Sequence, residues 1–322
     1  MVMAVDQDKL ARSILRHSDR TLRELARIRP WRPVADLLLC YALIAASFVL
    51  VAHAQALWAS AIGFIVIGTR LYAVFIMGHD GLHKNLLVRR SYNDALTQIA
   101  IYAPMGMHVE DQRKSHLTHH WLLGTERDPD RYLHAAANKA DFVRLFFFLS
   151  GLMTFPQTVA KVMHAKADGP PVRRAVSFVS SRKWAILAQA VIFGLIVWKL
   201  PWWYYLAFWI APIYVHVFLA NEIRAFCEHS QPVVPDSMAD GQRLITYVPN
   251  VVERLLFAPT NINYHAEHHL WMYVPYYNLP KLHAFVADHP QIEVRRSYLA
   301  YLWRYSRKLP LEAAAPMSRQ AV

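Results

Sequence analysis

Residues 37–83 read LLLCYALIAASFVLVAHAQALWASAIGFIVIGTRLYAVFIMGHDGLH, and this stretch decides the fold. It contains two apolar runs, 37–53 and 57–77, each close to the roughly 17–25 residues that a helix needs to cross a bilayer. Only about three residues separate the runs, so the two helices must be antiparallel neighbours. The sequence therefore predicts a transmembrane hairpin whose second helix ends beside two histidines.

A second hairpin is predicted further along the chain. Its runs are 184–198 and 202–220, and the turn between them holds Lys199 and Pro201 among tryptophans that suit the headgroup level. The 322 residues are 55% hydrophobic and only 18% charged, which is too apolar for an ordinary soluble enzyme of this length. We therefore expect an all-α membrane protein with four transmembrane helices in two hairpins.

The distribution of charge predicts the orientation. Lysines and arginines concentrate before the first span and between the hairpins, whereas the connection within the first hairpin has none. The positive-inside rule makes the basic side cytoplasmic, so we expect a multi-pass protein of the inner or plasma membrane with both termini in the cytoplasm. The net charge of +12 suits anionic headgroups, and the absence of interleaved basic and aromatic residues argues against nucleic acid as a partner.

One domain of 322 residues is expected. A cytoplasmic amphipathic leader (1–36) precedes the spans, residues 78–183 and 221–310 form a cytoplasmic helical cap, and 311–322 form a flexible tail. The leader offers an apolar face for the membrane surface, although a plain solvated helix is an equal alternative. This face would comprise Leu10, Ile14, Leu22 and Leu25.

Histidine is the residue that indicates chemistry, since eight of the 17 histidines fall in three tight groups. We call these groups box 1 (His79 and His83), box 2 (His116, His119 and His120) and box 3 (His265, His268 and His269). Histidines three or four residues apart share one face of a helix, where they can bind one metal. Imidazole suits iron, zinc, copper or nickel, and eight imidazoles exceed the need of one ion. The boxes therefore predict a dinuclear metal centre on the cytoplasmic side.

The isolated histidines are interpreted as structural. They are His17, His53, His108, His134, His164, His216, His283 and His289. His216 lies inside the fourth predicted span, where an ionisable residue is a functional hypothesis by default, but a hydrogen bond between helices explains it equally well.

The order and spacing of the boxes resemble those of the membrane fatty acid desaturase family, H-x(3,4)-H, H-x(2,3)-HH and H-x(2,3)-HH. The context of box 3, NINYHAEHHLWMYVPYYNLPKLH at 261–283, is also similar to that family. The resemblance implies two iron ions, activation of dioxygen with two external electrons, and desaturation of an aliphatic chain, foremost a fatty acyl lipid. It also implies a separate electron donor, such as a ferredoxin, rubredoxin or cytochrome, because the chain lacks the H-P-G-G signature of a fused haem domain.

His229 resembles the extra histidine that this family places between its second and third boxes, so we expect it to be a ninth ligand. The alternative is a surface histidine paired with Glu222 or Glu228. Four carboxylates near the boxes are candidate acceptors for imidazole N–H groups: Asp80, Asp128, Asp130 and Glu267. Asn261 or Asn263 could bind a metal-bound water, or could equally cap the helix that carries His265.

Other functions share some of these features. A hydroxylase or ketolase of a lipid or carotenoid would use the same boxes, as would a desaturase of a small metabolite such as an amino-acid-derived enol ether. A histidine-rich metal-binding membrane protein or transporter would place carboxylates along its spans, which have few here. A zinc protein would need fewer ligands.

Overall fold

The computed structural model describes residues 19–123, 125, 127–130, 142–150, 171–229, 244–286, 292–307 and 309, with the backbone alone at 19, 142–144, 148 and 171–181. These residues belong to two compact units, each assembled from separate stretches of the chain. Unit 1 comprises Met1–Ile28, Lys114–Phe146 and Ala220–Val322, and unit 2 comprises Arg29–Arg113 and Phe147–Leu219. The first part of the expected leader (1–18) and the expected tail (311–322) lie outside the described residues.

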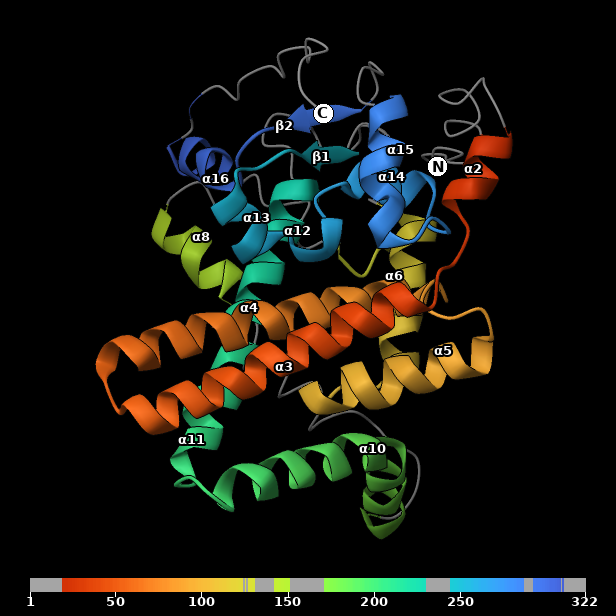
Figure 1. The fold of residues 1–322 in the computed structure, drawn as a ribbon. Helices are drawn as coiled ribbons and strands as arrows, with labels where there is room; N and C mark the ends of the chain where they lie inside the picture. The colour runs from red at the N-terminus through yellow and green to blue at the C-terminus, as the bar shows by residue number, and fades with distance from the viewer. Residues whose placement is uncertain are drawn as a thin grey trace. The chain divides into compact units, whose positions relative to one another are not determined.

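The first predicted hairpin forms in unit 2 from α3 (Trp31–Ala54) and α4 (Leu57–Leu82), which run side by side (Figure 1). A buried stripe on α3, spaced alternately three and four residues, faces the partner helix and includes Leu37, Cys40 and Ile44. A Cβ at Gly63 would lie 2.4 Å from Val51, so the small residue permits the close approach. Both helices extend beyond the predicted spans, and α4 reaches box 1.

After box 1, α5 (Arg90–Leu96) continues into the π-helix η1 (Thr97–Tyr102) and the short 3₁₀-helix η2 (Ala103–Met105). Gly106 ends this run in the left-handed region, with a φ of 76°. Then α6 (Val109–Leu122) begins in unit 2 and carries box 2 in its second half, which belongs to unit 1. Described parts of the next segment include α8 (Phe142–Leu149).

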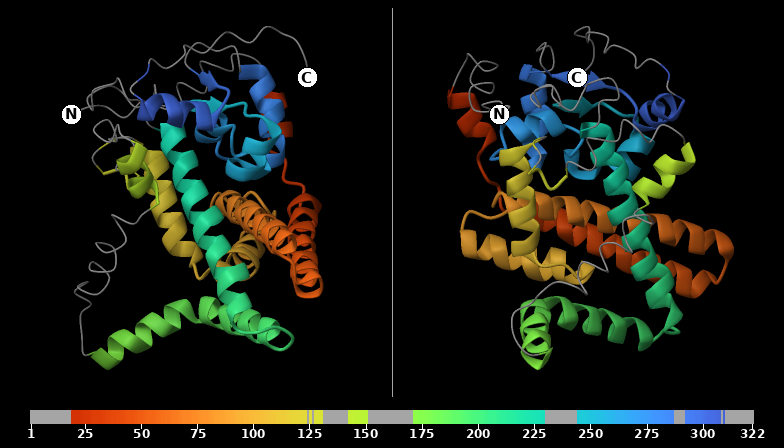
Figure 2. Two further views of the ribbon diagram at one scale, coloured as in Figure 1. Left: turned by 90° about the vertical axis from the view of Figure 1, so that its left-hand side faces the viewer. Right: turned by 180° about the vertical axis from the view of Figure 1, so that it is seen from behind.

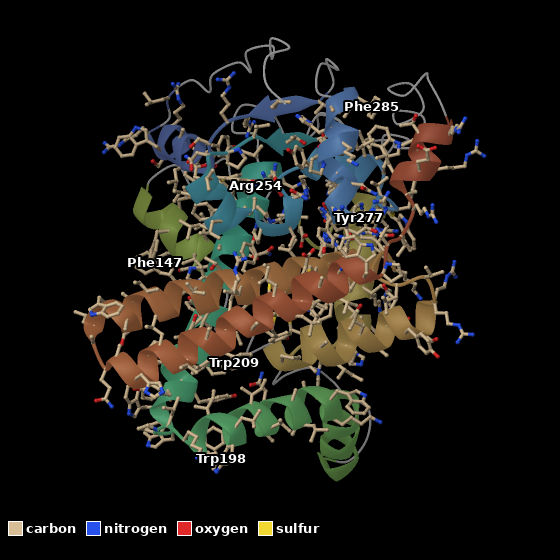
Figure 3. All side chains as sticks on the ribbon, in the orientation of Figure 1. Phe147, Trp198, Trp209, Arg254, Tyr277 and Phe285 are labelled. Carbon is tan, nitrogen blue, oxygen red and sulfur yellow. The ribbon has the colours of Figure 1, made fainter. Side chains whose placement is uncertain are left out.

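The second predicted hairpin comprises α10 (Pro171–Val197) and a long helix of four consecutive elements. These are α11 (Trp203–Tyr205), η4 (Leu206–Ile210), η5 (Ile213–Ala220) and α12 (Asn221–His229) (Figure 2). Trp198 follows the last turn of α10, and the indole of Trp209 donates a hydrogen bond of 3.2 Å to the carbonyl of Pro104 (Figure 3). Gln189 donates to the same carbonyl at 2.8 Å, so both helices are fixed to η2.

Three helices among the described residues are long and apolar enough to cross a membrane: Trp31–Ala54, Leu57–Leu82 and Trp203–His229. The fourth expected span lies within α10, whose apolar part from Trp184 to Val197 is 14 residues. At about 1.5 Å per residue that part is about 21 Å long, short of a hydrocarbon core of about 30 Å. The four-span arrangement with a cytoplasmic cap therefore stays a prediction.

The described part of unit 1 contains, besides helices and turns, two short strands that the sequence analysis did not predict. Strands β1 (Ile245–Tyr247) and β2 (Glu293–Arg295) pair in parallel, with Thr246 opposite Val294. The described helical elements of this unit, besides the end of α6 and residues 142–146 of α8, are α2 (Asp19–Leu25), α12, α13 (Val251–Phe257), η7 (Pro259–Asn261), α14 (His265–Leu270), η8 (Tyr276–Asn278), α15 (Leu279–Val286) and α16 (Tyr298–Ser306). The expectation of an all-α fold is therefore wrong in this detail.

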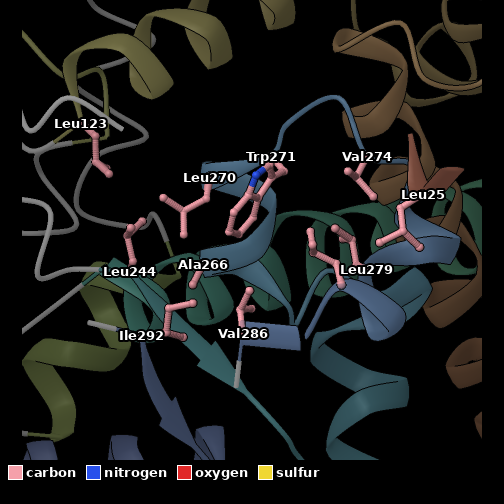
Figure 4. Packing of buried hydrophobic residues seen from close by; sticks show 11 residues of the cluster. Leu25, Leu123, Leu244, Ala266, Leu270, Trp271, Val274, Leu279, Val286 and Ile292 are labelled. Atoms are coloured by element: carbon pink, nitrogen blue, oxygen red, sulfur yellow. The ribbon is translucent and has the colours of Figure 1, made fainter. Parts of the chain in front are cut away.

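The hydrophobic core of unit 1 lies on one side of box 3. Ala266 and Leu270 of α14 pack with Trp271 and with residues of α15, as Figure 4 shows. Leu25 of α2 is part of this core, and the carbonyl of Leu25 accepts a hydrogen bond of 2.6 Å from Asn278. Leu25, one of the four residues of the expected apolar face, therefore packs against protein, and the role of the leader as a whole stays a prediction.

Candidate metal centre

Box 2 lies in the last two turns of α6, where the four-residue spacing puts His116 and His120 on one face. His119 and His120 are buried. The ring nitrogen Nδ1 of His119 lies 2.8 Å from Asp128 Oδ1, and Asp130 Oδ2 lies at 3.6 Å. Asp128 therefore has the imidazole contact that the sequence analysis expected. This contact holds Nδ1 and leaves Nε2 of His119 for another partner.

Box 3 fills α14, a helix of only six residues that are all buried. The chain enters this helix through two residues in the left-handed region, Thr260 (φ 52°) and Asn261 (φ 63°). The N-cap residue of this helix is Tyr264, whose side chain makes no capping hydrogen bond, so the capping role proposed for Asn261 or Asn263 is wrong. Asn261 contacts Arg254 and the carbonyl of Tyr276.

Asn263 instead ties the entry to box 3 to strand β1. Its amide donates a hydrogen bond of 2.8 Å to the carbonyl of Tyr247, and the Tyr247 N–H donates to the Asn263 carbonyl at 2.9 Å. The side-chain oxygen Oδ1 of Asn263 is buried with no hydrogen-bond partner among the described residues. That oxygen could accept a hydrogen bond from a metal-bound water, so this role of Asn263 stays a prediction.

The carboxylate of Glu267 secures α14 from the side opposite the box 3 histidines. It is 0% exposed and accepts hydrogen bonds from the Thr246 hydroxyl and from His283 Nδ1, the latter at 2.5 Å. The Thr246 hydroxyl also accepts from the Ala266 N–H at 3.3 Å, which supplies the missing cap from β1. Glu267 was expected to accept from an imidazole N–H, and the imidazole that it contacts belongs to His283, which is not a box histidine.

His283 is thus a structural support of α14, and the sequence analysis did not predict its contact with Glu267. As an isolated histidine in α15 it had been interpreted as a structural residue without further role. The signal that could have found it is the carboxylate in the middle of HAEHH, because a buried carboxylate requires partners. Sequence spacing does not say which partner the fold brings to it.

His229 ends α12 and is buried beside box 3, so the alternative of a solvated surface histidine is wrong. Its Nε2 lies 2.8 Å from His265 Nε2. The neighbouring Glu228 is fully buried, with Oε2 3.3 Å from His265 Nδ1 and paired with Arg224, while Oε1 accepts from the Tyr298 hydroxyl at 3.0 Å. Glu228 therefore lies beside the imidazole of His265 but makes no hydrogen bond to its Nδ1.

The histidines of unit 1 gather with their ring nitrogens facing one another. His116, His120 and His268 have ligand atoms within 4.8 Å of one another, and so do His119, His229 and His269. The Nε2 of His120 lies 3.0 Å from that of His116 and 3.2 Å from that of His268. Two nitrogens bound at about 2.1 Å and at right angles to one ion are about 3.0 Å apart. The spacing fits imidazoles that share an ion.

The protonation state of His265 also fits a metal ligand. Burial lowers the pKa of this imidazole well below its ordinary value, and the neighbouring histidines add to the effect. The neutral form is the one that binds a metal ion.

Box 1 is fixed within unit 2 by polar contacts at the end of α4. His79 lies in the last turn and His83 directly after it, with ring centroids 5.6 Å apart. The side chain of Asn93 donates to the Gly81 carbonyl at 2.8 Å and accepts from the Leu86 N–H at 3.1 Å. Asn93 is fully buried, and nothing in its local sequence indicated this role. Asp80, a predicted acceptor, is buried in the same turn.

Arg113 provides a second support for box 1. It donates to the Leu82 carbonyl at 3.1 Å and pairs with Asp94 and Glu110, each at 2.6 Å. In the sequence it counted only as one of the positive charges that set the orientation. Burial, and secondarily the charge of Arg113, lowers the pKa of His83 to about 3, so this imidazole is also neutral. The part that box 1 plays with boxes 2 and 3 stays a prediction.

The isolated histidines differ in their surroundings. His216 lies in η5 directly over Gly68 of α4, where a Cβ would come within 2.1 Å of its Nδ1. His53 is exposed at the end of α3, and His108 lies 3.9 Å from Asp111. Four isolated histidines lie outside the described residues: His17, His134, His164 and His289.

The profile of the family described as fatty acid desaturase matches residues 56–305. The chain belongs to the fatty acid desaturase family. Membership of this family makes it an enzyme of the oxidoreductase class. The matched region begins just before α4 and ends within α16, so it contains all three boxes and His229.

Three curated desaturases are similar to the chain at low identity. The sn-1 acyl-lipid omega-3 desaturase (ferredoxin) of Nostoc sp. is 22% identical over 66% of this chain and 63% of its own length. The protein of the same name from Synechocystis sp. is 22% identical over 74% and 70%, and the sn-1 oleoyl-lipid 12-desaturase of Synechocystis sp. is 26% identical over 70% and 68%. The match therefore spans less than two thirds of the Nostoc relative.

Proposed function

We propose that this desaturase-family protein is a membrane-embedded di-iron enzyme that introduces a double bond into the chain of a fatty acyl lipid. The reaction would be R–CH₂–CH₂–R′ + O₂ + 2 e⁻ + 2 H⁺ → R–CH=CH–R′ + 2 H₂O, with the electrons supplied by a separate donor protein. The observation that carries the proposal is the meeting of two histidine groups, one around His120 and one around His229, in a chain with apolar helices.

Each histidine group would hold one iron. His116, His120 and His268 would form one site, and box 1 would complete it with His79 and His83. The other site would use His119, His229, His265 and His269. Nine neutral nitrogen donors suit two iron ions and exceed the requirement of a single zinc ion.

The irons would supply the activation of dioxygen and the cleavage of the C–H bonds. Side chains around them would orient the ligands, as Asp128 lies 2.8 Å from Nδ1 of His119. Glu228 would contribute a negative charge 3.3 Å from Nδ1 of His265. Burial of these histidines excludes water from the donors, which protects the reaction from side reactions.

An acyl lipid is proposed as the substrate on two grounds. The relatives are named for acyl-lipid and oleoyl-lipid substrates, and the described spans give a lipid chain an apolar approach. The ferredoxin in the names of two relatives supports an iron–sulfur protein as the donor.

The test is expression in a bacterial host that makes saturated and monounsaturated lipids, with a plant-type ferredoxin and its reductase coexpressed. Mass spectrometry of the fatty acids should show species lighter by two hydrogens, and the His119→Ala variant should abolish them. An unchanged lipid profile with iron-loaded protein would contradict an acyl-lipid substrate, and hydroxylated chains would assign the protein as a hydroxylase.

A further inference from the structure

The outer face of α16 combines exposed apolar residues with arginines. Trp303 is 57% exposed and Leu299 52%, and the guanidinium of Arg307 lies 4.7 Å from the centroid of the Trp303 ring. The opposite face of the helix is buried through Tyr298, Tyr301 and Tyr305. Helix α16 therefore has a face that the described residues of unit 1 leave exposed.

The charge of this region is one-sided. Residues 292–307 contain four arginines and one acidic residue, Glu293, which pairs with Arg295 at 2.5 Å. Arg296 and Arg307 are exposed, and Arg304 is partly exposed. We call the outward set the α16 face, and it consists of Arg296, Leu299, Trp303, Arg304 and Arg307.

The inner side of the same helix contacts the candidate metal centre. The Tyr298 hydroxyl donates to Glu228 Oε1 at 3.0 Å, and Glu228 Oε2 lies 3.3 Å from Nδ1 of His265. The ring of Tyr298 also stacks on that of Tyr247, with centroids 4.0 Å apart. One hydrogen bond and one close approach of a carboxylate to an imidazole thus lead from the Tyr298 side chain of α16 to a candidate iron ligand.

We propose that the α16 face is the docking surface for the electron donor, a small acidic one-electron carrier of the iron–sulfur class. The inference rests on the proposed function and names the partner of the same site. In each encounter the reduced cluster of the donor loses one electron and the metal centre gains it. Two encounters deliver the two electrons of one turnover, and the two protons come from water.

The composition of the face favours this partner. Arginine and tryptophan are enriched among the residues that anchor protein interfaces, and opposite charge speeds the encounter of transient partners. The negative charge of an acidic carrier complements the three arginines of the α16 face. A carrier bound there would also lie next to the contacts that lead inward through Tyr298 and Glu228. A lipid surface would use the charge and the tryptophan but not the inward path.

The first test measures binding without requiring iron or turnover. The full chain in nanodiscs of neutral lipid is titrated with a plant-type [2Fe–2S] ferredoxin at low salt, as wild type and as Arg304→Glu/Arg307→Glu. We expect the dissociation constant to rise at least about tenfold in the double variant, and its dependence on salt to become weaker. The matched control is Arg89→Glu/Arg90→Glu, which makes the same charge change at exposed positions at the start of α5 and should leave binding within about twofold.

The second test measures reduction of the iron-loaded protein. Arg304→Glu/Arg307→Glu should lose donor-driven reduction but keep the wild-type rate with dithionite. Tyr298→Phe should bind the donor normally and be reduced more slowly by it than the wild type, with the dithionite rate again unchanged.

Unchanged donor affinity in Arg304→Glu/Arg307→Glu would overturn the proposal. A spin label at position 299 that reports a lipid environment would also overturn it and assign the face to the membrane. Failure of the proposed function is a separate result, because the iron-loaded protein would then give no desaturated product even with dithionite, whether or not the donor binds.

Discussion

Replacement of His283 by alanine should weaken iron binding although His283 is not a proposed ligand. His283 lies on α15 and donates to Glu267 of α14 over 2.5 Å. The substitution leaves one oxygen of a fully buried carboxylate without its imidazole partner. Since α14 has six residues and no side-chain cap of its own, we expect the box 3 histidines to lose their fixed position.

The magnitude follows from the burial of the pair. A hydrogen bond to a charged group contributes about 1.5–3 kcal/mol, and water cannot replace it at a carboxylate that is 0% exposed. If the lost hydrogen bond weakens iron binding by this whole free energy, because α14 is no longer ordered before iron binds, iron affinity falls by roughly 10- to 150-fold. About 1.4 kcal/mol corresponds to a factor of ten. His283→Gln should lose less, because its amide still has a donor for Glu267.

The assay is competition for iron between the purified protein and a chelator of known affinity, with iron per chain as the readout. The control is His53→Ala, which removes an exposed histidine at the end of α3 and should bind iron like the wild type. Wild-type iron retention in His283→Ala would refute the argument that the Glu267 contact positions box 3.

Three further predictions test other parts of the site. His119→Ala should insert into the membrane but lose bound iron and turnover, and full activity would remove His119 from the ligands. Purified iron-loaded protein with substrate and dioxygen alone should give at most one turnover per chain, so sustained turnover without donor or reductant would contradict an external electron supply. Gly68→Ala should lower the free energy of unfolding by about 1–3 kcal/mol, because its Cβ would lie 2.1 Å from His216 Nδ1. The double variant Gly68→Ala/His216→Ala should regain part of this stability in thermal unfolding. If it regains none, the strain lies elsewhere.

Local periodicity predicted the first hairpin and the helices that carry the boxes. The apolar runs before His79 are long and uninterrupted, so the two helices α3 and α4 were defined by the sequence to within a few residues. The three- and four-residue spacing of histidines likewise predicted a shared face on α6. These features depend on neighbours along the chain, which is why one sequence suffices to predict them.

Contacts between distant segments could not be predicted in this way. The partners of Glu267 are Thr246 and His283, 21 and 16 residues away, and Asn93 binds Gly81 across 12 residues. Strands β1 and β2 are three residues long and lie almost 50 residues apart, too short to leave an alternating pattern. The predicted capping by Asn261 or Asn263 failed for the same reason, because β1 supplies the cap.

The most direct test of the account is the metal content of the purified protein, measured by mass spectrometry together with Mössbauer spectra of protein grown on ⁵⁷Fe. Two groups of histidines around His120 and His229 predict two iron ions per chain, with spectra of two coupled high-spin sites of nitrogen-rich coordination. One zinc ion per chain, in protein that desaturates no lipid, would contradict the di-iron centre and the function proposed from it.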